Sequence, residues 1–163
     1  MHNVAKAPTA NQNILAVLAS VEDRSSLKSI LGHLQLDLRF AHTLEEAKAA
    51  LDSSSIDLLI SESSFEDGCS WRDFLPELHR VENAPLLVVA DSLADEVLWV
   101  EVLNLGAYDL LVKPFEARDV LHVVETARLC RADDRLRKPL QRGGIHDIQA
   151  RAAHGGGTGL TPR

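Results

Sequence analysis

Residues 85–115 read PLLVVADSLADEVLWVEVLNLGAYDLLVKPF, and this stretch contains a complete strand–helix–strand unit. Residues 85–90 are an unbroken apolar run of strand length, which is typical of a strand covered on both faces. Ser92 together with Asp95 can cap a helix that runs to Leu105, and Gly106 can end that helix in the left-handed conformation. Residues 108–112 form a second apolar run, which a Lys-Pro turn follows. The stretch therefore predicts two parallel strands joined by a helix.

The same alternation runs through the rest of the chain. Apolar runs predict further strands at residues 13–19, 37–41 and 56–61. Apolar spacing and capping signals predict helices at residues 22–34, 43–53 and 71–80, and a last helix from residue 117 to residue 130 or beyond. Thr43 and Glu46 have the spacing of a capping box, in which each side chain accepts from the backbone of the other. Five strands alternating with five helices predict an α/β, doubly wound fold with a five-stranded parallel sheet.

Composition and charge limit the classes of function. No stretch approaches the roughly 20 apolar residues that a membrane helix needs, and the polar N-terminus lacks a signal-peptide core, so we expect a cytoplasmic protein with no membrane contact. The chain has a net charge of −7. Residues 131–163 contribute +4, from seven Lys/Arg and three Asp, which leaves −11 for residues 1–130. An acidic body with only 4% aromatic residues does not suit a nucleic-acid partner.

The pattern also predicts how the chain is divided. Residues 1–12 are polar and are predicted to be disordered. Residues 13–130 contain all the predicted strands and helices and form the expected domain. Residues 131–163 are basic and rich in glycine, which favours a disordered tail.

Functional groups in such folds gather beyond the carboxyl ends of the strands, and these ends resemble those of a known family. Residues 13–17 and 56–60 resemble the first and third strands of the receiver domain of two-component response regulators. Residues 85–90, followed by Gly106-Ala107 and then by Lys113-Pro114-Phe115, resemble its fourth and fifth units. The resemblance implies a flavodoxin-like sheet with strand order 2-1-3-4-5. It also implies phosphoryl transfer from a histidine kinase to an Asp that ends the third strand.

The residues of that chemistry are largely replaced in this chain. The family holds a divalent cation with an acidic pair after the first strand, where this sequence has Leu18 and Ala19. Glu62 occupies the phosphoacceptor position, with its carboxylate one methylene further from the backbone. The resemblance therefore implies a pseudo-receiver that needs no cofactor and whose Mg²⁺ binding is lost or weak.

The parts of the family's switch are replaced as well. Ala90 lies where a Ser or Thr hydroxyl usually binds the phosphoryl group, and Leu110 lies at the aromatic switch position. Only Lys113 and the following Pro114 remain. Two alternatives stay open, namely a phosphoryl acceptor at Glu62 or a nearby loop acid, and a metal site rebuilt from loop acids. Those acids are Glu22, Asp23, Glu66, Asp67 and Asp91.

Glu62 and Lys113 should meet at the same edge of the sheet, because both follow or end parallel strands. We expect them to form an ion pair that holds the domain in one conformation. The alternative is that the Lys113 side chain extends into water.

The helix after the fourth strand suggests a surface for protein contacts. Helical spacing places Leu98, Val102 and Leu105 on one stripe, which we expect to face the sheet. The rest of the helix is also largely apolar, and its predicted interaction patch is Trp99, Val100 and Leu103. The resemblance implies a protein partner or a homodimer at the face of the fourth helix, fifth strand and fifth helix. The alternative is that the C-terminal tail covers this helix.

The sequence thus predicts a stand-alone receiver-like protein in two-component, or phosphorelay, signalling. We expect it to act through protein–protein interaction and to be no enzyme, since its seven histidines form no triad or ligand arrangement. A flavodoxin-like protein that binds a small molecule is the remaining alternative, although acids stand where a phosphate-binding loop would need hydroxyls and glycines.

Overall fold

The computed structural model describes residues 11–93 and 95–137, in which strands and helices alternate. The strands are β1 (Gln12–Val17), β2 (Leu36–Ala41), β3 (Leu58–Glu62), β4 (Leu86–Asp91) and β5 (Asp109–Val112). The helices are α1 (Val21–Leu31), α2 (Leu44–Ser53), the 3₁₀ helix η1 (Trp71–Phe74), α3 (Leu75–Arg80), α4 (Glu96–Asn104) and α5 (Ala117–Arg137). Every predicted strand is present, with ends shifted by one or two residues.

The strands form a single parallel sheet in the order β2-β1-β3-β4-β5, which confirms the predicted fold class. Parallel pairing brings the carboxyl ends of all strands to one edge. The register aligns Val17 with Ser61 and Glu62 with Ala90, so the ends of β1, β3 and β4 lie side by side.

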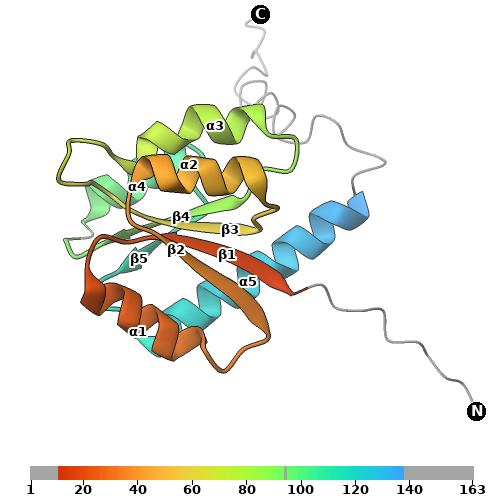
Figure 1. The fold of residues 1–163 in the computed structure, drawn as a ribbon, viewed down its shortest axis with the longest axis horizontal. Helices are drawn as coiled ribbons and strands as arrows, with labels where there is room; N and C mark the ends of the chain where they lie inside the picture. Colours follow the sequence, from red (N-terminus) through yellow and green to blue (C-terminus); the bar gives the residue numbers. More distant parts are fainter. Residues whose placement is uncertain (1–10, 94, 138–163) are drawn as a thin grey trace, which may run out of the picture. The chain divides into compact units, whose positions relative to one another are not determined.

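Helices cover both faces of the sheet, as Figure 1 shows. On one face α1 and α5 pack on a core that includes Leu27 and Val120. On the other face α2, η1, α3 and α4 pack on a second core, which includes Trp71 and Val102. Because both faces are covered, the central strands are apolar along nearly their whole length.

Local signals explain where the helices begin and end. The side chain of Asp95 accepts from Leu98 N at 2.8 Å and caps α4. Gly106 has φ of +95°, the left-handed conformation predicted for the residue that ends this helix. The predicted capping box is only half formed. Thr43 Oγ1 accepts from Glu46 N at 3.2 Å, but the Glu46 carboxylate accepts from His42 N instead of Thr43 N.

Two helices differ from the prediction. The helix predicted at residues 71–80 is divided into η1 and α3. Pro76 lies in the first turn of α3. It has no backbone N–H, so it cannot donate a helical hydrogen bond to a carbonyl of the preceding turn. The first helix, predicted at residues 22–34, ends at Leu31, where Gly32 is the C-cap. The last helix was predicted to reach residue 130 or beyond, and it extends to Arg137 because residues 131–137 contain neither Gly nor Pro to stop it.

Contacts divide the chain into two units, residues 1–129 and 130–163. The first strand, β1, begins at Gln12. The tail predicted at residues 131–163 is helical as far as Arg137. The rest of that tail, and residues 1–10, lie outside the described residues.

Candidate functional site at the carboxyl ends of the strands

The side chains that the sequence singled out meet at the carboxyl edge of the sheet. Leu18 follows β1, Glu62 ends β3, Ala90 lies near the end of β4, and Lys113 follows β5. The backbone N–H of Lys113 donates to Asp91 O at 2.9 Å, which ties the turn after β5 to β4. The parallel register therefore places Glu62 and the lysine in one cluster.

Lys113 is held by two carboxylates. Its Nζ lies 3.2 Å from Oε1 of Glu62 and 3.1 Å from Oδ2 of Asp23, at donor distance to both. The contact predicted between Glu62 and Lys113 is present. The contact of Asp23, which lies in the first turn of α1, was not predicted. The peptide bond from Lys113 to Pro114 is cis.

These contacts keep the ammonium charged in a partly buried place. Burial by itself lowers the pKa of Lys113, but the hydrogen bond to Asp23 and the charge and hydrogen bond of Glu62 outweigh that effect. The pKa of Lys113 therefore lies above its ordinary value of 10.5. The lysine is a permanent cation of the site at neutral pH.

Glu62 is buried, and its carboxylate has a second donor. The backbone N–H of Ala19 donates to Glu62 Oε1 at 3.3 Å. The same oxygen thus accepts from an amide after β1 and from the ammonium after β5. A buried carboxylate needs such donors, and here the chain itself supplies them.

The loop after β1 carries no metal-binding side chain. Leu18 is fully buried in the core, and the Ala19 side chain is a methyl group. The backbone carbonyls of both residues accept from Arg24 Nη1, at 2.8 and 3.1 Å. Arg24 Nη1 also lies 2.8 Å from His42 Nδ1, which acts as the acceptor because the guanidinium can only donate. The backbone carbonyls of this loop are therefore already hydrogen-bonded to Arg24.

A divalent cation does not fit this donor set. Mg²⁺ needs several hard oxygen ligands, but the carboxylates of Glu62 and Asp23 both contact Lys113. Within residues 11–93 and 95–137, no group of three or more His, Cys, Asp or Glu side chains could hold a metal ion. No step that requires a metal can be built from these residues.

A second polar contact joins the loops after β3 and β4. The Ser63 hydroxyl donates to Asp91 Oδ2, and Ser63 N donates to Ala90 O at 3.0 Å. Asp91 Oδ1 accepts from Leu93 N at 2.5 Å. Sequence reasoning missed this contact, although Ser63 directly follows Glu62 and Asp91 directly follows Ala90. The two loops are therefore connected by hydrogen bonds within the chain.

Ala90 and Leu110 are core residues in this structure. Ala90 is buried against the α1 and α5 face, and Leu110 packs against the second core beneath α4. Neither side chain can donate or accept a hydrogen bond.

The outer face of α4 is apolar and exposed, as predicted. Trp99 and Val100 are each about half exposed, and Leu103 is 38% exposed. Leu98 and Val102 face the core. The prediction for Leu105 is wrong, since this residue is 41% exposed. The helix ends at Asn104, so Leu105 no longer follows the helical stripe.

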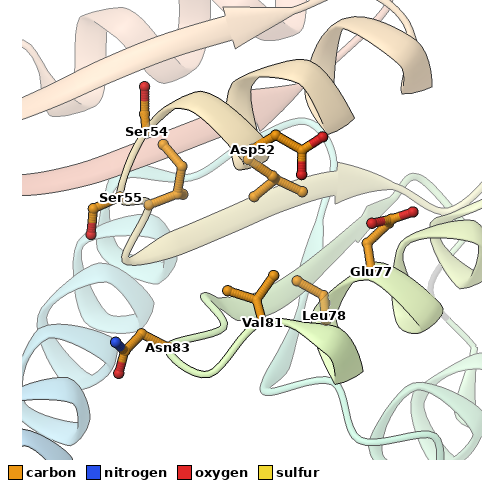
Figure 2. Close-up of a pocket in the computed structure, with 9 residues that line it drawn as sticks. Asp52, Ser54, Ser55, Glu77, Leu78, Val81 and Asn83 are labelled. Atoms are coloured by element: carbon orange, nitrogen blue, oxygen red, sulfur yellow. The ribbon is translucent and has the colours of Figure 1, made fainter.

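A small pocket lies elsewhere on the domain. Figure 2 shows it between the end of α2 and the end of α3, where Ser55 and Val81 lead into β3 and β4. Asp52 and Glu77 contribute carboxylates to its lining. Because it adjoins the starts of these strands, the pocket lies at the opposite edge of the sheet from Glu62 and Lys113.

No helix among the described residues is long and apolar enough to cross a membrane.

Comparisons with known proteins agree with this fold. No family model matches the chain. The response regulator protein PilR of Pseudomonas aeruginosa is 26% identical over 132 residues, which are 80% of this chain. The matched region spans only 28% of the length of that relative.

Solved structures show the same architecture. The signal receiver domain of an HD domain-containing protein from Pseudomonas fluorescens superposes with a TM-score of 0.72 and 25% identity, over 83% of this chain and 99% of that chain. The chemotaxis response regulator CheY4 of Vibrio cholerae superposes with a TM-score of 0.65 and 19% identity, over 72% of this chain and 99% of that chain.

Proposed function

Because the chain carries a receiver domain of the response-regulator type, we propose that it is a pseudo-receiver, which is not phosphorylated and acts in two-component signalling by binding another protein. In this proposal the domain has no enzymatic activity and needs no cofactor. Glu62 occupies the degenerate phosphoacceptor position, and Lys113 and Pro114 are retained from the ancestral pocket.

The observation that carries the proposal is the contact of Lys113 with both Glu62 and Asp23. Phosphoryl transfer to a carboxylate needs a cation that offsets the charge of the phosphoryl group and an ammonium that holds one of its oxygens. The ammonium is already engaged here. A phosphoryl group on Glu62 would add negative charge beside Asp23, and Leu18 and Ala19 supply no side chain for a cation.

The surroundings favour a module with one conformation. The Ser63–Asp91 hydrogen bond connects the loops after β3 and β4 without any phosphoryl group. Ala90 has no hydroxyl that could hydrogen-bond to a phosphoryl group, and Leu110 is partly buried against the second core. We propose that partner proteins bind this single conformation at the exposed face of α4, where Trp99, Val100 and Leu103 lie.

Incubation of the full chain with acetyl phosphate and Mg²⁺, followed by intact-mass measurement, tests the proposal. We expect no mass increase under conditions that label a receiver domain with an intact acidic pair and acceptor Asp. The variant Ala19→Asp/Glu62→Asp adds one carboxylate after β1 and shortens the acceptor side chain to Asp, and Ala19 is exposed enough to accept the change. A hydroxylamine-sensitive phosphoryl adduct on the wild-type chain would show that the domain is a phosphoryl acceptor.

A further inference from the structure

The outward side of α4 and the loop before it carry several exposed apolar side chains. We call it the α4 patch, and its members are Leu93, Val97, Trp99, Val100 and Leu103. Their exposed fractions run from 38% for Leu103 to 82% for Leu93. Leu98 and Val102 on the inward side already satisfy the packing of α4 on the sheet. The patch is therefore not needed to hold the helix in place, and exposed apolar surface of this kind marks contact sites.

The stretch of chain that carries α4 is acidic. Residues 81–112, which contain β4, α4 and β5, include six Asp or Glu and no Lys, Arg or His. Among the described residues, Asp91, Asp95 and Glu96 form no ion pair with a cationic side chain. Glu101 pairs with Arg72 of η1, so that neighbouring cation is already used. An apolar surface with an acidic border results.

We propose that the α4 patch binds an amphipathic segment of another protein, in which apolar residues are flanked by Lys or Arg. This inference rests on the proposed function and specifies its partner. Trp99 is the expected anchor, because tryptophan is enriched among the residues that dominate binding energy. Basic residues of the partner would face Asp95 and Glu96 and would raise the association rate.

The same charge argues against a second copy of the domain, nucleic acid and an anionic membrane as occupants. A twofold contact between two copies would bring two acid-bordered patches together without a basic residue of α4 or β5 between them. Nucleic acid and anionic lipid headgroups are repelled by the acidic border.

Binding of a synthetic peptide to the full chain tests the inference. The probe is a fluorescein-labelled amphipathic helix of Leu and Lys, about 14 residues long, and its matched control replaces each Lys by Glu. We expect saturable binding of the Lys peptide by fluorescence anisotropy, and binding of the Glu peptide weaker by at least about tenfold. Light scattering should give the mass of a monomer.

Variants decide whether the α4 patch carries this binding. Trp99→Ala/Leu103→Ala should lower the affinity for the Lys peptide by about tenfold or more. Glu96→Lys should also lower this affinity, although it removes no apolar surface. Val21→Ala is the matched control, since Val21 is an exposed apolar residue of α1, away from the patch. Circular dichroism checks that each variant is folded.

Three results would overturn the inference. Equal affinity for both peptides would show that charge does not select the partner. An unchanged affinity in Trp99→Ala/Leu103→Ala would show that the acidic body attracts the peptide without the patch. A dimer that this double substitution dissociates would show that the occupant is a second copy. A phosphoryl adduct in the acetyl phosphate assay would refute the proposed function while leaving the peptide result unchanged, so the two failures are distinguishable.

Discussion

Substitution of Lys113 by Met removes the ammonium between Glu62 and Asp23 and keeps a side chain of similar length. Two carboxylates, only 11% and 19% exposed, then lie at the edge of the sheet without their cation. We expect Lys113→Met to remain folded and to lose a substantial part of the free energy of unfolding.

The size of the loss follows from the distances and the burial. Coulomb's law with an effective dielectric constant of about 20 gives roughly 5 kcal/mol of attraction for each carboxylate at 3.1–3.2 Å. Desolvation of the three charged groups offsets much of this attraction. Loss of one partner costs about 3–5 kcal/mol in a buried pair, and an exposed pair contributes only about 0–1 kcal/mol. For these partly exposed groups we expect a loss of about 2–3 kcal/mol.

Urea denaturation at neutral pH, followed by circular dichroism and by the fluorescence of buried Trp71 and half-exposed Trp99, measures this loss. Lys28→Met is the matched control, because Lys28 is exposed and forms no ion pair among the described residues, and it should change stability by less than about 0.5 kcal/mol. Adding Glu62→Gln to Lys113→Met should recover part of the stability, since it removes one unpaired carboxylate. Equal stability of Lys113→Met and Lys28→Met would refute the argument that the ion pairs hold the strand ends together.

Three further predictions concern pH, metal and backbone. The pKa of Lys113 in the folded protein lies above its ordinary value of 10.5, so the stabilisation by its charge is complete below pH 10.5 and is lost as the pH rises through the folded pKa. The stability difference between wild type and Lys113→Met should therefore shrink in urea titrations above about pH 10.5. Addition of about 10 mM MgCl₂ should shift the wild-type Tm by less than about 1 °C in calorimetry, because the carboxylates of Glu62 and Asp23 are already paired with Lys113. A shift of several degrees would indicate a rebuilt cation site. Gly106→Ala should cost about 1–2 kcal/mol in urea denaturation, since φ is +95°, and the neighbouring Asn104→Ala should stay within about 0.5 kcal/mol of wild type.

Much of the fold could be predicted because its signals are local. Apolar runs identified the strands, and Gly106 correctly indicated where α4 ends, whereas the N-cap of α4 is Asp95 by itself and not Ser92 with Asp95. Errors arose where neighbouring residues compete for the same role. The Glu46 carboxylate accepts from His42 N instead of Thr43 N, and Leu105 leaves the helical stripe once the helix has ended.

The candidate site could be predicted only in part. Glu62 and Lys113 were expected to meet because parallel strands bring their carboxyl ends to one edge. The role of Asp23 could not be read in this way, since it contacts a lysine 90 residues further along the chain through a helix whose position depends on core packing. The Ser63–Asp91 contact depends in the same way on two loops that approach only after the sheet has formed.

The amino-acid sequence by itself determined the parallel βα architecture and the residue types at the strand ends. Periodicity, caps and turns act over a few residues and are therefore visible in one dimension. The tertiary structure decided which groups hold Lys113, how Arg24 hydrogen-bonds to the carbonyls of Leu18 and Ala19, and that Leu105 remains exposed. Such contacts depend on side-chain reach and on the packing of several elements at once, because residues distant in sequence become neighbours only when the two cores close on the sheet.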